Sequence, residues 1–387
     1  MINNFLKYLP IKLFYNLIKL RKYLLYKFYE SNIYELCNYL NSKNDQLKLF
    51  ILYYSYLPKQ GSDAWFKSRK GNELSPPIIG GSEMKDLITN PKLIIERKLE
   101  INKFSGNIHT KWGNLFEPII ANIMDKLLNT KSYETGSIPG IVNNNGHVVQ
   151  AYSPDRLCMC DSESINNLLT NKINYVNKVQ KVEAGEKIVL MEYKCPSIRI
   201  PDGKIPYEYR MQPPTGLSTI KIADLALFCN ASFRKCTKQQ YLTEGYDKKF
   251  HYKDGSEYTQ ALFYGYIIFP GESEDLGEAQ TDYLTKIFTE KTKIYSNIFT
   301  KPELPEVSGK ILYWKLYRLS CIPVISDKNY LDSLKPNILE ITDLIHNIKI
   351  TAMQKLKNGE IKDVDDYYSD QIEKKYDDET IKFFNEI

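Results

Sequence analysis

The chain has 387 residues, of which 43% are hydrophobic and 26% are charged, a composition ordinary for folded globular proteins that excludes disordered and fibrous classes. Its formal net charge of +5 is small, so charge alone indicates nucleic-acid binding only weakly, and a positive groove must come from folding. The seven cysteines are an odd number without framework spacing, and we recognise no signal peptide. We therefore expect an intracellular, reducing environment.

Residues 1–56 are predicted to form a basic helical N-terminal extension. The stretch 1–28 holds six basic and no acidic side chains, and its apolar residues recur at helical spacing. Basic residues and a proline interrupt this apolar face, so no segment reaches the ~20 apolar residues that a transmembrane span needs. We expect the extension to dock on the core, with membrane-surface attachment and a partner interface as the alternatives.

The main domain is predicted over residues 57–350, and its first half reads as alternating helices and turns. A polar break at 59–63 precedes a helix that contains Arg69, and residues 78–83 read as a strand end that turns into a helix. Backbone N–H groups at such a helix start can hold a phosphate, and Ser82 adds a hydroxyl group there. Two more helices are expected, over residues 94–103 and from residue 111 onward.

The second of these helices carries a carboxylate among apolar positions. Glu117 lies between Phe116 and Ile119, and an uncompensated buried charge is costly. Two explanations stay open at this point: the side chain is exposed on the helix surface, or it faces a metal ion.

The centre of the chain is predicted to hold two catalytic strands. Turn residues in 136–150 indicate a hairpin whose last strand ends just before Asp155. The apolar, β-prone run 188–194 follows, and period-2 alternation places Glu192 and Lys194 on the same face of that strand. The connection between them, residues 161–186, is polar and predicts a surface insertion.

Beyond residue 196, Gln212 enters a helical region that Pro213-Pro214 is expected to interrupt. The tail, residues 351–387, is acidic and predicts either a mobile appendix or a weak helix. The expected fold class is α/β of the α+β type, with a central mixed β-sheet flanked by helices. Its remaining elements are strands over 222–228, 261–269 and 310–325 and helices over 282–297 and 330–350.

Two carboxylates and a lysine at this spacing are typical of metal-assisted phosphodiester hydrolysis. Asp155 and Glu192 are the candidate ligands of Mg²⁺, which prefers six oxygen ligands and retains several waters. The backbone carbonyl of Tyr193 could supply a further oxygen. Lys194 could orient or help deprotonate the attacking water and offset the charge that develops at phosphorus.

Five short segments, in this order along the chain, resemble the PD-(D/E)XK nuclease superfamily. Within it they are similar to the phage lambda exonuclease-like group, also called the YqaJ viral recombinase family, which includes viral alkaline exonucleases. The segments are Trp65 to Gly71, Gly81-Ser82-Glu83, Trp112 to Glu117, Ser153 to Leu157, and Glu192 to Pro196 followed by Tyr209 to Gln212.

The resemblance implies a restriction-endonuclease-like core with a two-metal site. By that resemblance, Asp155 and Glu192 bind the metals, Glu117 completes the acidic site from its helix, and Lys194 serves the attacking water. The implied cofactor is Mg²⁺, with Mn²⁺ as a substitute.

A second group of residues is implied to bind the substrate. Arg69 and Ser82 would grip a phosphate group, which suits the fixed fork of arginine donors, and Gln212 would lie beside the active site. The chain departs from the family pattern at Arg156, where glycine is usual, in the length of the 161–186 connection, and at the prolines after Gln212.

The resemblance implies a 5′→3′ exonuclease that acts on the ends of double-stranded DNA. Such an enzyme exposes 3′ single strands for viral-type recombination, repair or replication, acts with a single-strand annealing or binding protein, and assembles as a homotrimer. For a viral protein, the expected location is the host cytoplasm or the site of viral DNA replication. The alternatives are a structure-specific endonuclease or resolvase and a catalytically silent DNA-binding recombination scaffold.

Four cysteines raise the alternative of an iron–sulfur cluster, as in some related nucleases. Their spacing does not match a cluster motif, so we expect plain packing of reduced thiols. The four are Cys158, Cys160, Cys229 and Cys236.

Overall fold

The computed structural model describes residues 31–101, 106–242, 250–251, 257–258, 261–269, 295–297 and 310–377. The apolar, basic stretch predicted within residues 1–28 lies outside the described residues. Within the described part of the chain, no helix has the length and hydropathy that crossing a membrane requires.

The α-helices are α3 (Ser31–Asn38), α4 (Lys43–Tyr54), α5 (Asp63–Lys70), α6 (Met84–Thr89), α7 (Pro91–Lys98), α8 (Ile108–Leu127), α9 (Ser162–Thr170), α10 (Gln212–Thr219), α11 (Lys238–Leu242), α13 (Tyr330–Lys357) and α14 (Val364–Asp377). Two short 3₁₀ helices are η1 (Gly81–Glu83) and η2 (Tyr207–Tyr209). The strands are β1 (Ile79–Gly80), β2 (Ile138–Val142), β3 (Val148–Tyr152), β4 (Arg156–Asp161), β5 (Glu186–Lys194), β6 (Leu225–Cys236), β7 (Phe250–His251), β8 (Glu257–Tyr258), β9 (Phe263–Phe269), β10 (Tyr295–Asn297) and β11 (Lys310–Val324).

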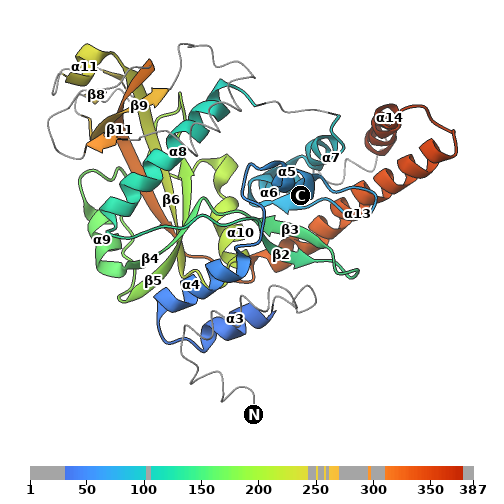
Figure 1. The fold of residues 1–387 in the computed structure, drawn as a ribbon, viewed down its shortest axis with the longest axis horizontal. Helices are drawn as coiled ribbons and strands as arrows, with labels where there is room; N and C mark the ends of the chain where they lie inside the picture. The colour runs from blue at the N-terminus through green and yellow to red at the C-terminus, as the bar shows by residue number, and fades with distance from the viewer. Residues whose placement is uncertain are drawn as a thin grey trace.

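A six-stranded mixed sheet forms the centre of the molecule, in the order β10-β9-β11-β6-β5-β4 (Figure 1). Strands β5 and β6 run parallel, while the other neighbouring pairs are antiparallel. β4 and β5 pair in register from Arg156 opposite Met191 to Asp161 opposite Glu186. The predicted fold class, a mixed sheet flanked by helices, is confirmed.

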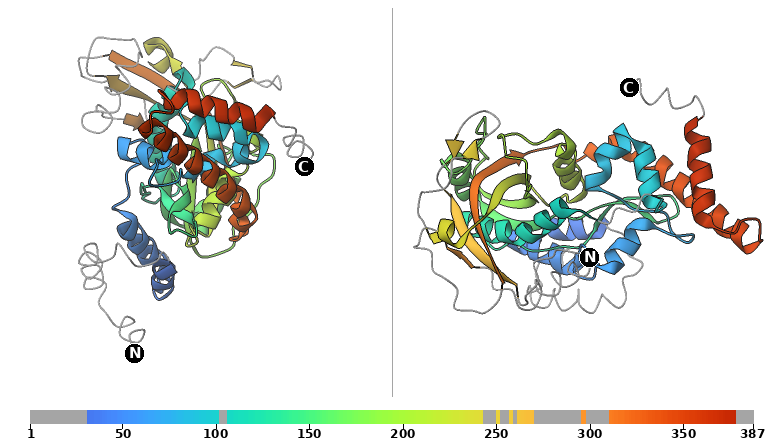
Figure 2. Two further views of the ribbon diagram at one scale, coloured as in Figure 1. Left: turned by 90° about the vertical axis from the view of Figure 1, so that its right-hand side faces the viewer. Right: turned by 90° about the horizontal axis from the view of Figure 1, so that it is seen from above.

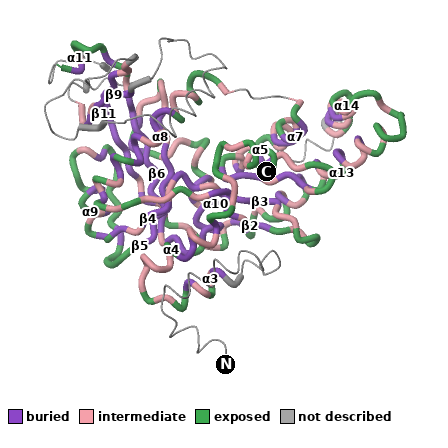
Figure 3. Tube along the Cα trace, viewed as in Figure 1, coloured by how far each residue is buried: buried purple, intermediate pink, exposed green. Residues whose placement is uncertain are grey.

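Both faces of this sheet are covered, because strand alternation sends apolar side chains to each side. One face packs against α8 and α9 through a buried cluster that includes Phe116, Ile120 and Phe233. The opposite face packs against α4 and α10, with Phe50 and Leu217 buried there. Figure 3 shows the central strands as a continuous buried layer.

A second, smaller unit lies at one end of the large sheet. Strand β3 pairs with β1 in parallel and with β2 antiparallel, and helices α6, α7, α13 and α14 cover this three-stranded sheet. Figure 2 shows α13 and α14 extending away from the large sheet. The predicted hairpin within 136–150 is confirmed, with Gly146 at a φ of 80° in its turn.

The described part of the N-terminal extension docks on the core, as expected. α3 and α4 pack on the sheet face that carries Ile188 and Leu190. The Tyr34 hydroxyl donates to the carbonyl of Thr219 at 2.8 Å, and Lys43 pairs with Asp224 at 2.8 Å.

The connection over residues 161–186 differs from its prediction as a surface insertion. Helix α9 occupies its first part, and Ile165, Leu168 and Leu169 from this helix are buried in the main core. The many polar residues of the segment obscured this short apolar stripe.

Three other predictions concern helices. Pro213 and Pro214 do not interrupt the helix after Gln212, because they occupy the first turn of α10, where a missing N–H costs nothing. Residues 282–294 of a predicted helix lie outside the described residues, and Tyr295–Asn297 form strand β10. Over its described residues, the acidic tail, predicted as a mobile appendix or a weak helix, forms the end of α13 and helix α14, in which Tyr368 and Ile372 are buried.

Candidate active site

The ends of two paired strands bring the predicted acidic residues together. Asp155 lies in the short turn between β3 and β4, and Glu192 lies near the end of β5. Because β4 pairs with β5 from Arg156 opposite Met191, the turn places the Asp155 carboxylate beside the backbone of Tyr193. The Tyr193 N–H donates to Asp155 Oδ2 at 2.6 Å.

The Glu192 carboxylate is fully buried and accepts hydrogen bonds from three side chains. Tyr152 donates its hydroxyl to Oε2 at 2.7 Å, while Lys194 Nζ and Gln212 Nε2 both donate to Oε1 at 2.5 Å. The donation from Lys194 confirms that residues 192 and 194 share a strand face. These donors supply the compensation that a buried carboxylate requires.

Burial and mutual repulsion raise the proton affinity of the acidic group. Burial, followed by the negative charges of Glu192 and Glu117, holds the pKa of Asp155 well above its usual value. Burial also raises the pKa of Glu117, although the positive charges of Lys194 and Arg156 act against it. For Lys194, burial lowers the pKa, but the charges of Glu192 and Asp155 outweigh it and the pKa is raised. Such strongly perturbed groups cluster at functional sites.

A pocket of about 510 Å³ opens onto this group of charges. Glu117, Tyr193 and Lys194 are among the residues that line it, so Glu117 faces this pocket from α8. Tyr209 forms another part of the wall, and its ring centroid lies 5.1 Å from Lys194 Nζ and 5.2 Å from Arg199 Cζ. The pocket volume falls within the ~300–1,000 Å³ typical of ligand sites.

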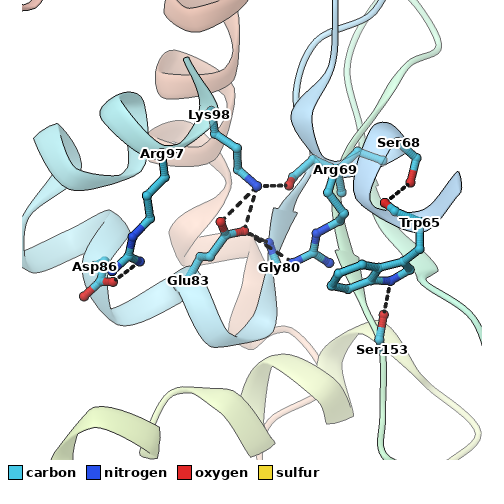
Figure 4. A network of polar contacts seen from close by, with 10 residues as sticks. Trp65, Ser68, Arg69, Gly80, Glu83, Asp86, Arg97, Lys98 and Ser153 are labelled. Carbon is cyan, nitrogen blue, oxygen red and sulfur yellow. Dashed lines mark hydrogen bonds and ion pairs between the residues drawn. The ribbon is translucent and has the colours of Figure 1, made fainter. Parts of the chain in front are cut away.

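Arg69 belongs to a separate, largely buried ion network (Figure 4). Its guanidinium Nη2 lies 3.3 Å from Glu83 Oε2, and its Cζ lies 4.9 Å from the ring centroid of Trp65. Lys98 Nζ lies 2.9 Å from Glu83 Oε1 and donates to the carbonyl of Ile78 at 2.8 Å. Burial alone would raise the pKa of Glu83, but the positive charges of Lys98 and Arg69 lower it.

The network and the acidic site are joined through one tryptophan and one glycine. Trp65 Nε1 donates to Ser153 Oγ at 3.1 Å, two residues before Asp155. A Cβ atom added at Gly81 would lie 2.3 Å from the ring of Tyr152, whose hydroxyl group bonds Glu192, so η1 packs directly against this ring. Ser82, next to Gly81, is exposed.

The structure thus joins Lys194 and Gln212 to Glu192 by direct hydrogen bonds, places Asp155 against the backbone of the next residue, Tyr193, and lines one pocket with Glu117 and Lys194. Arg69 and Ser82 lie on neighbouring elements outside this bonded group. Sequence reasoning had assigned no role to Tyr152, Glu83, Lys98 or Tyr209. Tyr152 stands at the end of a strand leading to Ser-Pro-Asp, and that position was the one available signal for it.

The donor set suits a hard divalent cation. It offers carboxylate oxygens from Asp155, Glu192 and Glu117, and the buried Gln212 Oε1 beside them has no hydrogen-bond partner. Among the described residues, no three His, Cys, Asp or Glu side chains converge closely enough to enclose an ion unaided. The backbone carbonyl of Tyr193, water and substrate oxygens would therefore have to complete the coordination.

Comparisons with known proteins find relatives in sequence and a neighbour among solved structures. A protein of African swine fever virus, isolate Tick/South Africa/Pretoriuskop Pr4/1996, is 23% identical over 334 residues, covering 78% of this chain and 90% of the relative. Its counterpart in the Badajoz 1971 Vero-adapted strain is 23% identical over 335 residues, with the same shares covered. Among solved structures, the alkaline exonuclease LHK-Exo from Laribacter hongkongensis aligns with a TM-score of 0.40 and 12% identity, covering 78% of this chain and 100% of that one.

Residues 64–218 match the model of the YqaJ-like viral recombinase domain. This range contains every residue predicted for the site, from Arg69 to Gln212. The resemblance inferred from the five motifs is confirmed. Over residues 64–218 the chain is therefore similar to the YqaJ-like viral recombinase domain, the family that the motifs indicated.

Proposed function

We propose that this protein is a Mg²⁺-dependent exonuclease that removes nucleotides from the 5′-ended strand at double-stranded DNA ends and leaves 3′ single strands. The observation that carries the proposal is the convergence of Asp155, Glu192 and Lys194 at the end of β5, beside a pocket that Lys194 and Glu117 line. Two or three carboxylates and a lysine are the groups that hydrolysis of a phosphodiester requires.

Asp155, Glu192 and Glu117, with the Tyr193 carbonyl, would hold the cation in a two-metal site, with Mn²⁺ as a substitute for Mg²⁺. Bound there, the cation would supply a Lewis acid and a more acidic water. Burial, followed by repulsion from Glu192 and Glu117, raises the pKa of Asp155, and this supports the assignment because a cation between the carboxylates would offset the repulsion.

The protein groups around the cation would orient the reactants. Lys194 would hold the attacking water and balance the charge growing on the phosphoryl oxygens. Tyr152 and Gln212 would fix the orientation of Glu192, since each donates a hydrogen bond to it. Arg69 and Ser82 would bind the terminal phosphate, and the short link from Trp65 to Ser153 supports placing them near the cleaved bond.

At the level of the whole chain, we place the nuclease domain at residues 57–350, between the N-terminal extension of residues 1–56 and the acidic segment 351–387. The proposed substrate is the end of a DNA duplex, and the proposed partner is a single-strand annealing or binding protein. We further propose a homotrimer that encloses DNA, located in the host cell at the site of viral DNA replication.

Comparing linear with covalently closed circular duplex DNA tests the exonuclease assignment. The proposal predicts Mg²⁺-dependent loss of the linear form and survival of the closed circle. Equal cleavage of both would favour the structure-specific endonuclease or resolvase. Binding without cleavage in either metal would instead identify a DNA-binding scaffold.

A further inference from the structure

Gly113 occupies an unfavourable position for a glycine, inside the long helix α8 (Ile108–Leu127). A glycine in a helix interior destabilises it relative to alanine, because the unfolded chain has more freedom to lose. Some local requirement normally accounts for such a residue.

The folded protein itself does not supply that requirement. A Cβ atom added at Gly113 would meet no atom within 4 Å, whereas the same atom at Gly81 or Gly216 would collide with the Tyr152 ring. Gly113 is also absent from the residues with a left-handed backbone. Neither packing nor backbone conformation therefore explains the missing side chain.

The open space above Gly113 belongs to the pocket at the candidate active site. Gly113 lines this pocket one helical turn before Glu117, so the two positions lie on the same face of α8. The pocket wall also carries two cationic side chains, Lys194 and Arg199, which share the ring of Tyr209. A bare helix surface beside two cations suits a bulky anionic chain.

We propose that the phosphodiester backbone of the cleaved DNA strand passes directly against α8 at Gly113, one turn from Glu117. This inference rests on the proposed nuclease function and adds a substrate-contacting position to it. A side chain at residue 113 would occupy the space of the strand and move the scissile phosphate away from Glu117 and Lys194.

The test compares Gly113→Ala and Gly113→Leu with the control Asn122→Ala, which changes an exposed position on the same helix outside the pocket. Both alanine variants should raise the melting temperature, because alanine favours the helix. On linear duplex DNA with Mg²⁺, Gly113→Ala should lower kcat/KM about 10-fold and Gly113→Leu about 100-fold, since small misplacements of reacting groups are costly. Asn122→Ala should retain the parent kcat/KM.

Binding of a 5′-fluorescein duplex, measured by anisotropy with EDTA present, separates this inference from the proposed function. A parent that binds but does not cleave, with binding weakened by Gly113→Leu, would refute the nuclease proposal and support the close approach at Gly113. Parental cleavage and binding in Gly113→Leu would overturn the inference alone. An equal loss of kcat/KM in Gly113→Ala and Gly113→Leu would also overturn the inference, because a loss that does not depend on side-chain size indicates a stiffer helix rather than occupied space.

Discussion

At the residue scale, the candidate site depends on how one buried carboxylate is held. Glu192 is inaccessible to solvent and relies on Tyr152, Lys194 and Gln212 for its hydrogen bonds. The donors come from three elements: Tyr152 from β3, Lys194 from β5 and Gln212 from α10. The orientation of Glu192 therefore depends on how these three elements pack together. Side chains fixed in this way are the preorganised groups on which catalysis relies.

Asp155→Asn should abolish most cleavage while leaving the fold intact. The substitution keeps the size of the side chain and its acceptor for the Tyr193 N–H but removes the negative charge. We expect a loss of at least about 100-fold in kcat. Asp161→Asn is the matched control, because it makes the same change at an exposed position at the far end of β4. Parental turnover in Asp155→Asn would remove this residue from the site.

Tyr152→Phe should weaken both stability and turnover. It deletes the hydroxyl group that donates to Glu192 in a buried environment. The expected loss in the free energy of unfolding is about 1.5–3 kcal/mol, the usual contribution of a hydrogen bond to a charged group. Urea unfolding measures this loss, and an unchanged midpoint would show that Glu192 does not depend on Tyr152.

Much of the site could be read from residue types and strand alternation. Period-2 geometry was sufficient to place Glu192 and Lys194 on one face, because side chains of a strand alternate regardless of tertiary context. The donors from Tyr152 and Gln212 could not be derived in this way, because they come from β3 and α10, whose positions relative to β5 depend on the whole fold. The pairing of Arg69 with Glu83 and Lys98 is non-local in the same sense.

At the scale of elements, the ion network fixes α5, η1 and α7 to one another. Glu83 accepts from the Gly80 N–H at 2.7 Å and pairs with both Arg69 and Lys98. Glu83→Gln would leave two buried cations, Arg69 and Lys98, without this counter-charge. We expect a loss of about 3 kcal/mol in the free energy of unfolding, as for other broken buried pairs.

The control for this substitution is Glu340→Gln, on an exposed face of α13, which should change stability by no more than about 0.5 kcal/mol. Chemical denaturation of both variants provides the comparison. Equal denaturation midpoints for Glu83→Gln and Glu340→Gln would show that Glu83 contributes no more to stability than a surface carboxylate does.

Lys349 gives a pH dependence to the contact between α13 and the end of α5. Its Nζ donates to the carbonyls of Lys70 at 2.7 Å and Gly71 at 3.2 Å, and burial lowers its pKa to about 8. The folded protein therefore releases this proton near pH 8, whereas the unfolded chain holds it until about pH 10.4. Between these values the unfolded state binds more protons, so this group makes stability rise with pH.

Lys349→Met removes this contribution. Relative to the variant, the parent should gain about 1–2 kcal/mol in the free energy of unfolding between pH 8 and pH 10. The comparison is necessary because other groups act in the opposite direction, such as Cys37, whose pKa burial raises to about 12. Lys335→Met, exposed on α13, serves as the control. If the free energies of unfolding of the parent and Lys349→Met differ by the same amount at every pH, Lys349 is not the source of the pH dependence.

Two predictions about elements were wrong: the surface insertion at residues 161–186 and the helix break after Gln212. In both cases the local composition did not indicate how the segment packs. The stretch that contains α9 is rich in Asn, Ser and Lys, yet three apolar residues suffice to bury one face of a short helix. The proline pair after Gln212 is a helix breaker in an interior but a favourable start in a first turn. Which case applies depends on where the helix begins, and the sequence offered no other marker there.

At the scale of the whole molecule, the mixed sheet was predictable from its longer strands, such as β5, β6 and β11, which are apolar and β-prone. The strand order β11-β6-β5-β4 was not, since it depends on pairings between segments far apart in the sequence, such as β6 with β11. The smaller unit could not be predicted for the same reason, because its helices α6 and α7 pack against α13 and α14, which lie far away in the sequence. The site itself lies where the large sheet meets the short hairpin β2–β3.

The most direct measurement is a time course on linear duplex DNA labelled at either the 5′ or the 3′ end, with Mg²⁺ or with chelator, using the parent and Asp155→Asn. We predict that the parent with Mg²⁺ releases the 5′ label early as a mononucleotide and leaves the 3′-labelled strand to shorten gradually. Chelator and Asp155→Asn should each suppress release. Early release of the 3′ label would contradict the polarity, and label release that persists in Asp155→Asn or in chelator would contradict the metal-assisted site.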